Sequence, residues 1–97
     1  HYIEAISYSG TRQAAHDRLL QIIRSEKRTE ILVDQENYIR VEFTSALFRF
    51  VDDVEFYFQK EKADEKLIHV RSASRIGSSD LGVNRKRIER IRSEFYR

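Results

Sequence analysis

Carboxylates and an arginine stand close enough in the sequence to support acid–base chemistry. Asp52, Asp53 and Glu55 fall within one short stretch, and Arg71 follows at a distance that a single hairpin would close. A carboxylate can act as a general base while an arginine holds the charge of an anionic substrate. These residues are the candidates for a hydrolase-type site. Because Asp52 and Asp53 are adjacent, they would point to opposite faces of a strand, and only a turn would let them act together.

Apolar alternation predicts how the segments around these residues pair. Residues 53–59 and 67–73 each alternate apolar and polar side chains, which is typical of strands with one buried face. If the buried faces coincide in an antiparallel hairpin, Phe56 lies opposite Val70. A slip of one residue would bury charged side chains, so this register is strongly favoured.

The same register sets Glu55 against Arg71 and Tyr57 against His69 on the other face. The simpler interpretation is a cross-strand ion pair that only stabilises the sheet. The alternative is that these polar side chains form the floor of a ligand site on a sheet face that no helix covers.

A second cluster lies at the start of the last helix, where Arg85, Lys86 and Arg87 are consecutive. The amino end of a helix carries the positive end of its macrodipole, so basic residues are unfavourable there. Negative charge is therefore expected nearby. Asp80 can cap the helix, and Arg87 flanks its apolar stripe, which makes Arg87 the favoured buried partner for the acidic turn.

Two sources could supply the negative charge that these basic residues require. The favoured one is internal, a structural polar network whose members are Asp53, Asp80, Asn84 and Arg87. The other is an external anion, held by loop amides and by the side chains of Arg75, Ser78, Ser79 and Arg85.

Other chemistry is not supported by the sequence. There is no cysteine, so thiolate, iron–sulfur and cysteine–zinc sites are excluded. His1, His16 and His69 lack metal-ligand spacing, and we expect neither metal nor cofactor. The loop from Gly77 to Gly82 is followed by Val and Asn instead of Lys and Ser/Thr, so it does not match a phosphate-binding loop.

Hydrophobic periodicity predicts the elements that position these residues. We expect a strand at 2–8, a helix at 12–25 capped by Thr11, a hairpin of 29–34 with 38–44, strands around 54–58 and 68–70, and a helix from Asp80 onward. A change of apolar parity after Phe43 suggests a bulge near Ser45, and residues 60–66 are expected to form a turn. The predicted fold class is α+β, a single domain over residues 1–97 with order β-α-β-β-β-β-α, a largely antiparallel sheet and two helices packed on one face.

Charge is unevenly distributed along the 97 residues, whose net charge is +2. Residues 1–70 hold 10 basic and 13 acidic side chains, whereas residues 71–97 hold 8 basic and 3 acidic ones. The basic C-terminal helix raises nucleic-acid binding as an alternative. Glu89 and Glu94 are interspersed with its arginines, which favours a solvated, salt-bridged surface and makes nucleic acid an improbable partner.

No stretch is long and apolar enough for a transmembrane segment, and no secretory signal is present. The chain begins at His1 and contains no Met. We therefore expect a piece from which an N-terminal lead-in or targeting segment has been lost.

Two blocks carry a family resemblance. Residues 50–56, FVDDVEF, and residues 70–88, VRSASRIGSSDLGVNRKRI, resemble the family named domain of unknown function 1499. With the helix at 12–25 the similarity covers nearly the whole chain. The resemblance implies a bacterial or plastid group without an established activity, many members of which carry an export or membrane-anchoring segment. It supports the predicted fold and transfers no catalytic residues.

The sequence thus favours a non-enzymatic binding or interaction module whose ligand is a small anion or an acidic protein partner. A hydrolase-type enzyme for an anionic substrate is the first alternative. Nucleic-acid binding through the C-terminal helix is the second.

Overall fold

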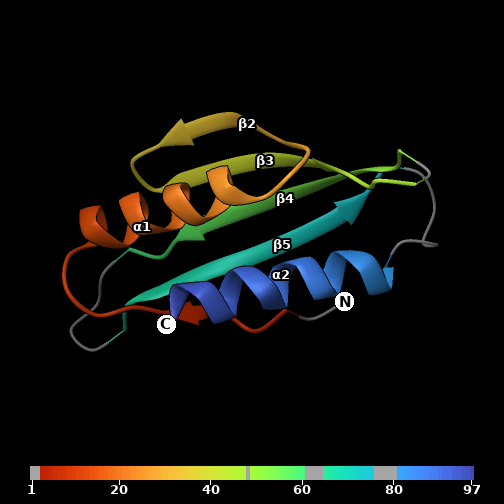
Figure 1. Cartoon of the computed structure of the whole chain (residues 1–97). Helices are drawn as coiled ribbons and strands as arrows, with labels where there is room; N and C mark the ends of the chain where they lie inside the picture. Colours follow the sequence, from red (N-terminus) through yellow and green to blue (C-terminus); the bar gives the residue numbers. More distant parts are fainter. Residues whose placement is uncertain (1–2, 48, 61–64, 76–80) are drawn as a thin grey trace.

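The elements follow the predicted order. The computed structural model describes residues 3–47, 49–60, 65–75 and 81–97, with side chains in the last range from residue 85 onward. The elements are β1 (Ile6–Ser7), α1 (Arg12–Ser25), β2 (Thr29–Gln35), β3 (Tyr38–Thr44), β4 (Val51–Phe58), β5 (Leu67–Ser74) and α2 (Leu81–Phe95) (Figure 1). The five strands form one antiparallel sheet in the order β1-β5-β4-β3-β2. The predicted α+β class is confirmed.

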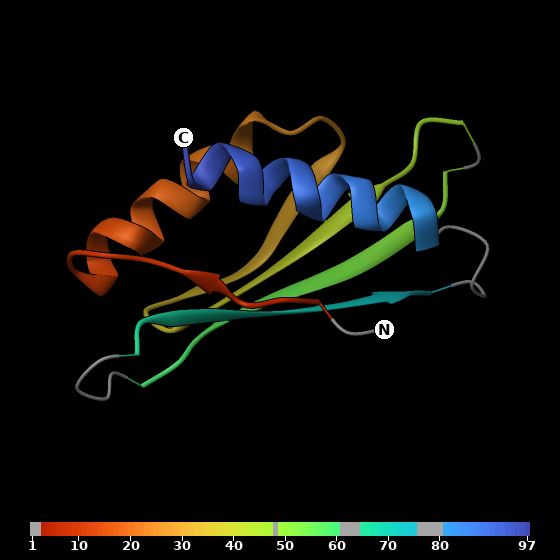
Figure 2. The ribbon, with the colours of Figure 1, turned by 90° about the horizontal axis from the view of Figure 1, so that it is seen from below.

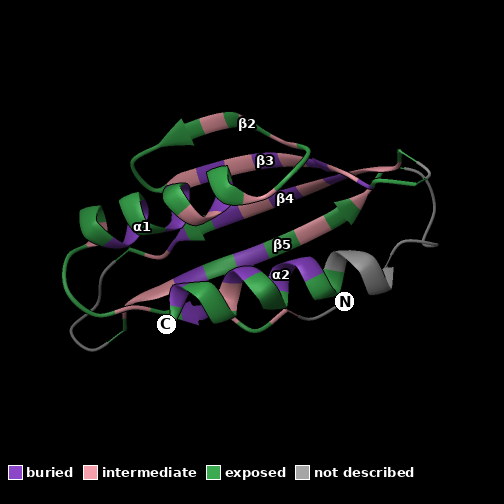
Figure 3. Cartoon of the chain, viewed as in Figure 1, coloured by how far each residue is buried: buried purple, intermediate pink, exposed green. Residues whose placement is uncertain are grey.

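Both helices lie on one face of the sheet, as Figure 2 shows from below. Side chains in β3 and β4 alternate between this covered face and the opposite, open face, so that every second residue is buried (Figure 3). The core between sheet and helices includes Phe43, Val54, Phe56, Leu19 and Ile91, all without exposed surface.

Helix α1 has the predicted bounds because local signals and tertiary packing agree. The Thr11 side chain caps it by accepting a hydrogen bond from the backbone N–H of Ala14 at 3.1 Å. Ala15, Leu19 and Ile23 then recur on one stripe and are buried. The hairpin of β2 with β3 also forms as predicted.

Two predictions about strands were wrong. The first strand covers only Ile6–Ser7 instead of residues 2–8. No bulge continues the strand past Ser45: its N–H donates to the Phe50 carbonyl at 2.8 Å, and its Oγ accepts from the Phe50 N–H at 3.0 Å. The parity change marks a reversal between β3 and β4. The register shift lies instead in β2, between Ile31 and Val33.

An arginine of α1 holds the end of α2. Arg18 Nε donates to the Phe95 carbonyl at 2.9 Å, and its Nη2 donates to the carbonyls of Glu94 at 3.2 Å and Arg97 at 2.9 Å. The last carbonyls of a helix have no partner within the helix and carry its negative dipole end, so a guanidinium there stabilises α2.

The turn expected at 60–66 and the loop before α2 fall partly outside the described residues, at 61–64 and 76–80. Within the part of the chain that is described, no helix meets the length and apolarity that crossing a bilayer requires.

Candidate functional site

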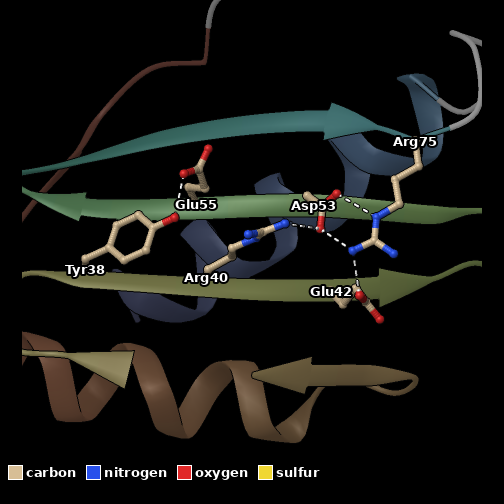
Figure 4. A network of polar contacts seen from close by, with 6 residues as sticks. All are labelled: Tyr38, Arg40, Glu42, Asp53, Glu55 and Arg75. Atoms are coloured by element: carbon tan, nitrogen blue, oxygen red, sulfur yellow. Dashed lines mark hydrogen bonds and ion pairs between the residues drawn. The ribbon is translucent and has the colours of Figure 1, made fainter. Parts of the chain in front are cut away.

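The cross-strand register predicted for the open face is confirmed. Glu55 lies opposite Arg71, and Tyr57 lies opposite His69. The ion pair expected between Glu55 and Arg71 is not formed; the Glu55 carboxylate instead accepts a hydrogen bond from the Tyr38 hydroxyl at 2.5 Å (Figure 4). This bond stabilises the protonated phenol and raises the pKa of Tyr38.

His69 turns to another partner. Its Nε2 lies 2.5 Å from the Gln59 side-chain oxygen, and the opposing Tyr57 is half exposed. The polar side chains proposed as the floor of a ligand site therefore share a face without forming one connected cluster.

Asp53 is the centre of a connected network on the open face (Figure 4). Arg75 donates two hydrogen bonds to its carboxylate, from Nε to Oδ2 at 2.8 Å and from Nη2 to Oδ1 at 2.9 Å. Arg75 Nη2 also donates to the Glu42 carboxylate at 2.6 Å. Arg40 adds a contact of 3.4 Å to Asp53 Oδ1. The hydrogen bond from Arg75 holds the pKa of Asp53 below its usual range. A carboxylate with a lowered pKa is a poor general base.

Asp52 points the other way, into the core, and is fully buried. Arg87 of α2 donates from Nη1 to Asp52 Oδ2 at 3.2 Å, and its guanidinium stacks on Phe43 with 4.6 Å to the ring centroid. The second oxygen, Oδ1, accepts no hydrogen bond from any described group.

These placements separate the residues that the sequence grouped for catalysis. Asp52 lies on the covered face, whereas Asp53, Glu55 and Arg71 lie on the open face. The expected polar network also needs correction, because Arg87 pairs with Asp52 and not with Asp53. The cause is strand parity, since only one of two adjacent carboxylates can face α2. Asp80 and the side chain of Asn84 lie outside the described residues.

The anion-binding candidates are not brought together either, as far as they are described. Arg75 is held by carboxylates on the open face, while Arg85 is exposed on α2, on the other side of the sheet. Ser78 and Ser79 lie outside the described residues.

A different set of cations surrounds a hollow of about 660 Å³ on the helix side of the sheet. We call it the basic pocket. The residues that line it come from the turn after α1, the turn after β3 and the first half of α2: Ser25, Glu26, Lys27, Arg28, Ser45, Ala46, Leu47, Lys86, Arg87 and Arg90. The lining thus contains five cationic side chains and one carboxylate.

Part of this positive charge is compensated locally. Arg90 donates to the Glu26 carboxylate at 2.6 Å and 3.2 Å, which raises the pKa of Arg90. Arg87 forms an ion pair with Asp52, which is buried in the core. Lys27, Arg28 and Lys86 form no ion pair with any carboxylate among the described residues; Arg28 Nε donates only to the Thr44 carbonyl, at 3.2 Å.

His16 and His69 each have a partner other than a metal-ligand cluster among the described residues. His16 is buried, and its Nε2 lies 2.9 Å from both Asp34 Oδ1 and the Gln35 carbonyl oxygen. Across residues 3–47, 49–60, 65–75 and 85–97, no three His, Cys, Asp or Glu side chains are arranged to hold a metal ion.

Comparison with known proteins places the chain by family. A family model described as "Protein of unknown function (DUF1499)" matches residues 1–95. The chain belongs to the DUF1499 family. The match spans every helix and strand described above, including the pocket residues. No curated protein matches the sequence.

Proposed function

We propose that the chain is a non-enzymatic binding module whose basic pocket holds an anionic ligand of the phosphate class. The observation that carries this proposal is the charge of the lining, five cations and one carboxylate around a hollow of about 660 Å³. Pockets of about 300–1,000 Å³ suit small molecules. The favoured ligand is therefore a phosphorylated small molecule or headgroup, larger than a bare ion.

The pocket combines fixed and adaptable donors. Arg87 is 7% exposed and is held from below by Asp52 and Phe43, so its direction is set before a ligand arrives. Lys27, from the turn after α1, and Lys86, from α2, are exposed and can turn their ammonium groups to an oxyanion. A planar guanidinium and mobile ammonium groups together suit the oxygens of a phosphate.

The state of the open-face carboxylates also supports binding over catalysis. Asp53 is clamped by Arg75, and Glu55 is bonded to Tyr38. Neither lines the basic pocket, where Glu26 is the one carboxylate and is itself paired with Arg90. A general base next to a bound anion would have to come from elsewhere.

Calorimetric titration at low ionic strength tests the proposal, with inorganic phosphate and glycerol phosphate as probes. We expect saturable binding that is tighter for glycerol phosphate. A charge-assisted hydrogen bond contributes about 1.5–3 kcal/mol, so the double variant Lys27→Ala/Lys86→Ala should weaken binding by about ten-fold or more.

Lys60→Ala is the matched control, because Lys60 is an exposed lysine after β4 that does not line the pocket. It should bind both probes as the unaltered chain does. Equal loss in the control, or no saturation with either probe, would overturn the proposal. Binding only to an oligonucleotide, with affinity that falls steeply with salt, would favour the nucleic-acid alternative instead.

A further inference from the structure

An exposed leucine lies on the rim of the basic pocket. Leu47 is 80% exposed, far more than any other large hydrophobic side chain described. It stands in the turn between β3 and β4 and lines the pocket together with Ala46. A single exposed leucine is common on protein surfaces, so the exposure alone carries no function. Its position is informative, because Leu47 lies beside Lys27, Arg28 and Lys86, which form no ion pair with a described carboxylate.

The leucine and the cations occur at one end of the molecule. In both Figure 1 and Figure 2 the turn after β3 extends beyond the sheet at the end where α2 begins. Lys27 and Arg28 approach from the turn after α1, and Lys86 from α2. An apolar tip beside lysines and arginines is the combination that binds anionic bilayers, because the cations attract headgroups while the apolar side chain enters the interface.

We propose that this end of the molecule docks on a membrane surface that carries anionic phospholipids, with a headgroup phosphate in the basic pocket and Leu47 in the interfacial layer. The inference rests on the proposed function, since it names the lipid headgroup as the source of the phosphate. Charge complementarity supports this occupant: the pocket lining has four more cations than anions, and the cytoplasmic leaflet and similar surfaces are negative.

Co-sedimentation with vesicles tests the docking. The probes are vesicles of phosphatidylcholine alone and vesicles of phosphatidylcholine with an equal share of phosphatidic acid. The chain should co-sediment with the mixed vesicles and remain in the supernatant with the neutral ones. Each lysine near an anionic surface contributes to the free energy of membrane binding. The double variant Lys27→Ala/Lys86→Ala should therefore lower the partition coefficient on the order of thirty-fold.

The leucine is tested separately. Leu47→Ser should lower partitioning into mixed vesicles by about five-fold, because the apolar side chain no longer enters the interface. Leu32→Ser is the matched control, since Leu32 is also exposed, at 42%, but stands in β2 and does not line the pocket. Circular dichroism verifies that each variant is folded.

The phosphate titration separates the two possible failures. If the chain binds glycerol phosphate but not mixed vesicles, or if Leu47→Ser and Leu32→Ser partition equally, the membrane inference is overturned and the proposed function stands. If neither inorganic phosphate nor glycerol phosphate binds, the proposed function fails, and the inference falls with it.

Discussion

At the scale of single residues, the adjacent carboxylates of Asp52 and Asp53 lie in opposite environments. Asp52 is fully buried against Arg87, while Asp53 lies on the open face within a network that includes Arg75, Arg40 and Glu42. Strand alternation alone produces the difference, because consecutive side chains point to opposite faces. One carboxylate thus anchors α2 to the sheet, and the next ties β3, β4 and the end of β5 together.

Removal of Arg87 should be costly. Arg87→Met leaves the Asp52 carboxylate buried without its cation, and we expect the free energy of unfolding to fall by about 3–5 kcal/mol. Urea denaturation followed by circular dichroism measures the loss. The double variant Asp52→Leu/Arg87→Met should recover most of it, because no buried charge then remains. A loss below about 1 kcal/mol in the single variant would show that the pair is unimportant.

Asp53 should contribute to acid sensitivity. Because Arg75 lowers its pKa in the folded state, the ionised carboxylate stabilises the fold above its ordinary pKa of about 3.9, and this contribution is lost as pH falls through the lowered value. Asp53→Asn should cost about 1 kcal/mol at pH 7 and progressively less at acidic pH. Urea titrations across pH measure the difference. Glu30→Gln, at an exposed position of β2, is the control and should run parallel to the unaltered chain.

At the scale of elements, α2 is held by arginine contacts as well as by its buried apolar residues. Its first half is held by the Arg87 pair, and its last carbonyls accept hydrogen bonds from Arg18 of α1. Arg92 adds hydrogen bonds to the backbone carbonyls of Glu4 and Ala5, ahead of β1. The position of α2 therefore depends on arginines as much as on its apolar stripe, and α2 in turn carries one wall of the basic pocket.

Arg18→Ala should loosen the end of α2. We expect a loss of about 1–2 kcal/mol, since several carbonyls lose a charged donor, and faster hydrogen exchange in the last turn of α2. Arg24→Ala is the control, because Arg24 is exposed on the same helix and does not contact the end of α2. Unchanged exchange in Arg18→Ala would contradict a capping role.

At the scale of the whole molecule, the sequence predicts how the sheet and helices are layered, but it does not predict the basic pocket. Alternation in 53–59 and 67–73 was enough to predict the sheet register, because a slip would bury charge. The charge count also located the basic character in the C-terminal segment, which supplies Lys86, Arg87 and Arg90 to the lining.

The pocket escaped prediction for a physical reason. Its cations come from segments far apart in the chain, and only the tertiary fold brings Lys27 and Arg28 beside Lys86. The sequence predicts a bulged strand after β3 because Ala46, Phe48 and Phe50 alternate with other residues as in a strand. This prediction puts Ala46 and Leu47 within a sheet, whereas they line the pocket from a turn.

The irregularity in β2 has a consequence for how copies of the chain meet. β2 is an edge of the sheet, and a free edge is a template on which other chains can polymerise. The register shift at Ile31 and Val33 leaves Leu32 out of the ladder and breaks that template into two short pieces. Acidic side chains at Glu30 and Asp34 add repulsion between identical edges. The strand is thus a poor template for fibril growth, while its inner side pairs with β3 on both sides of Leu32.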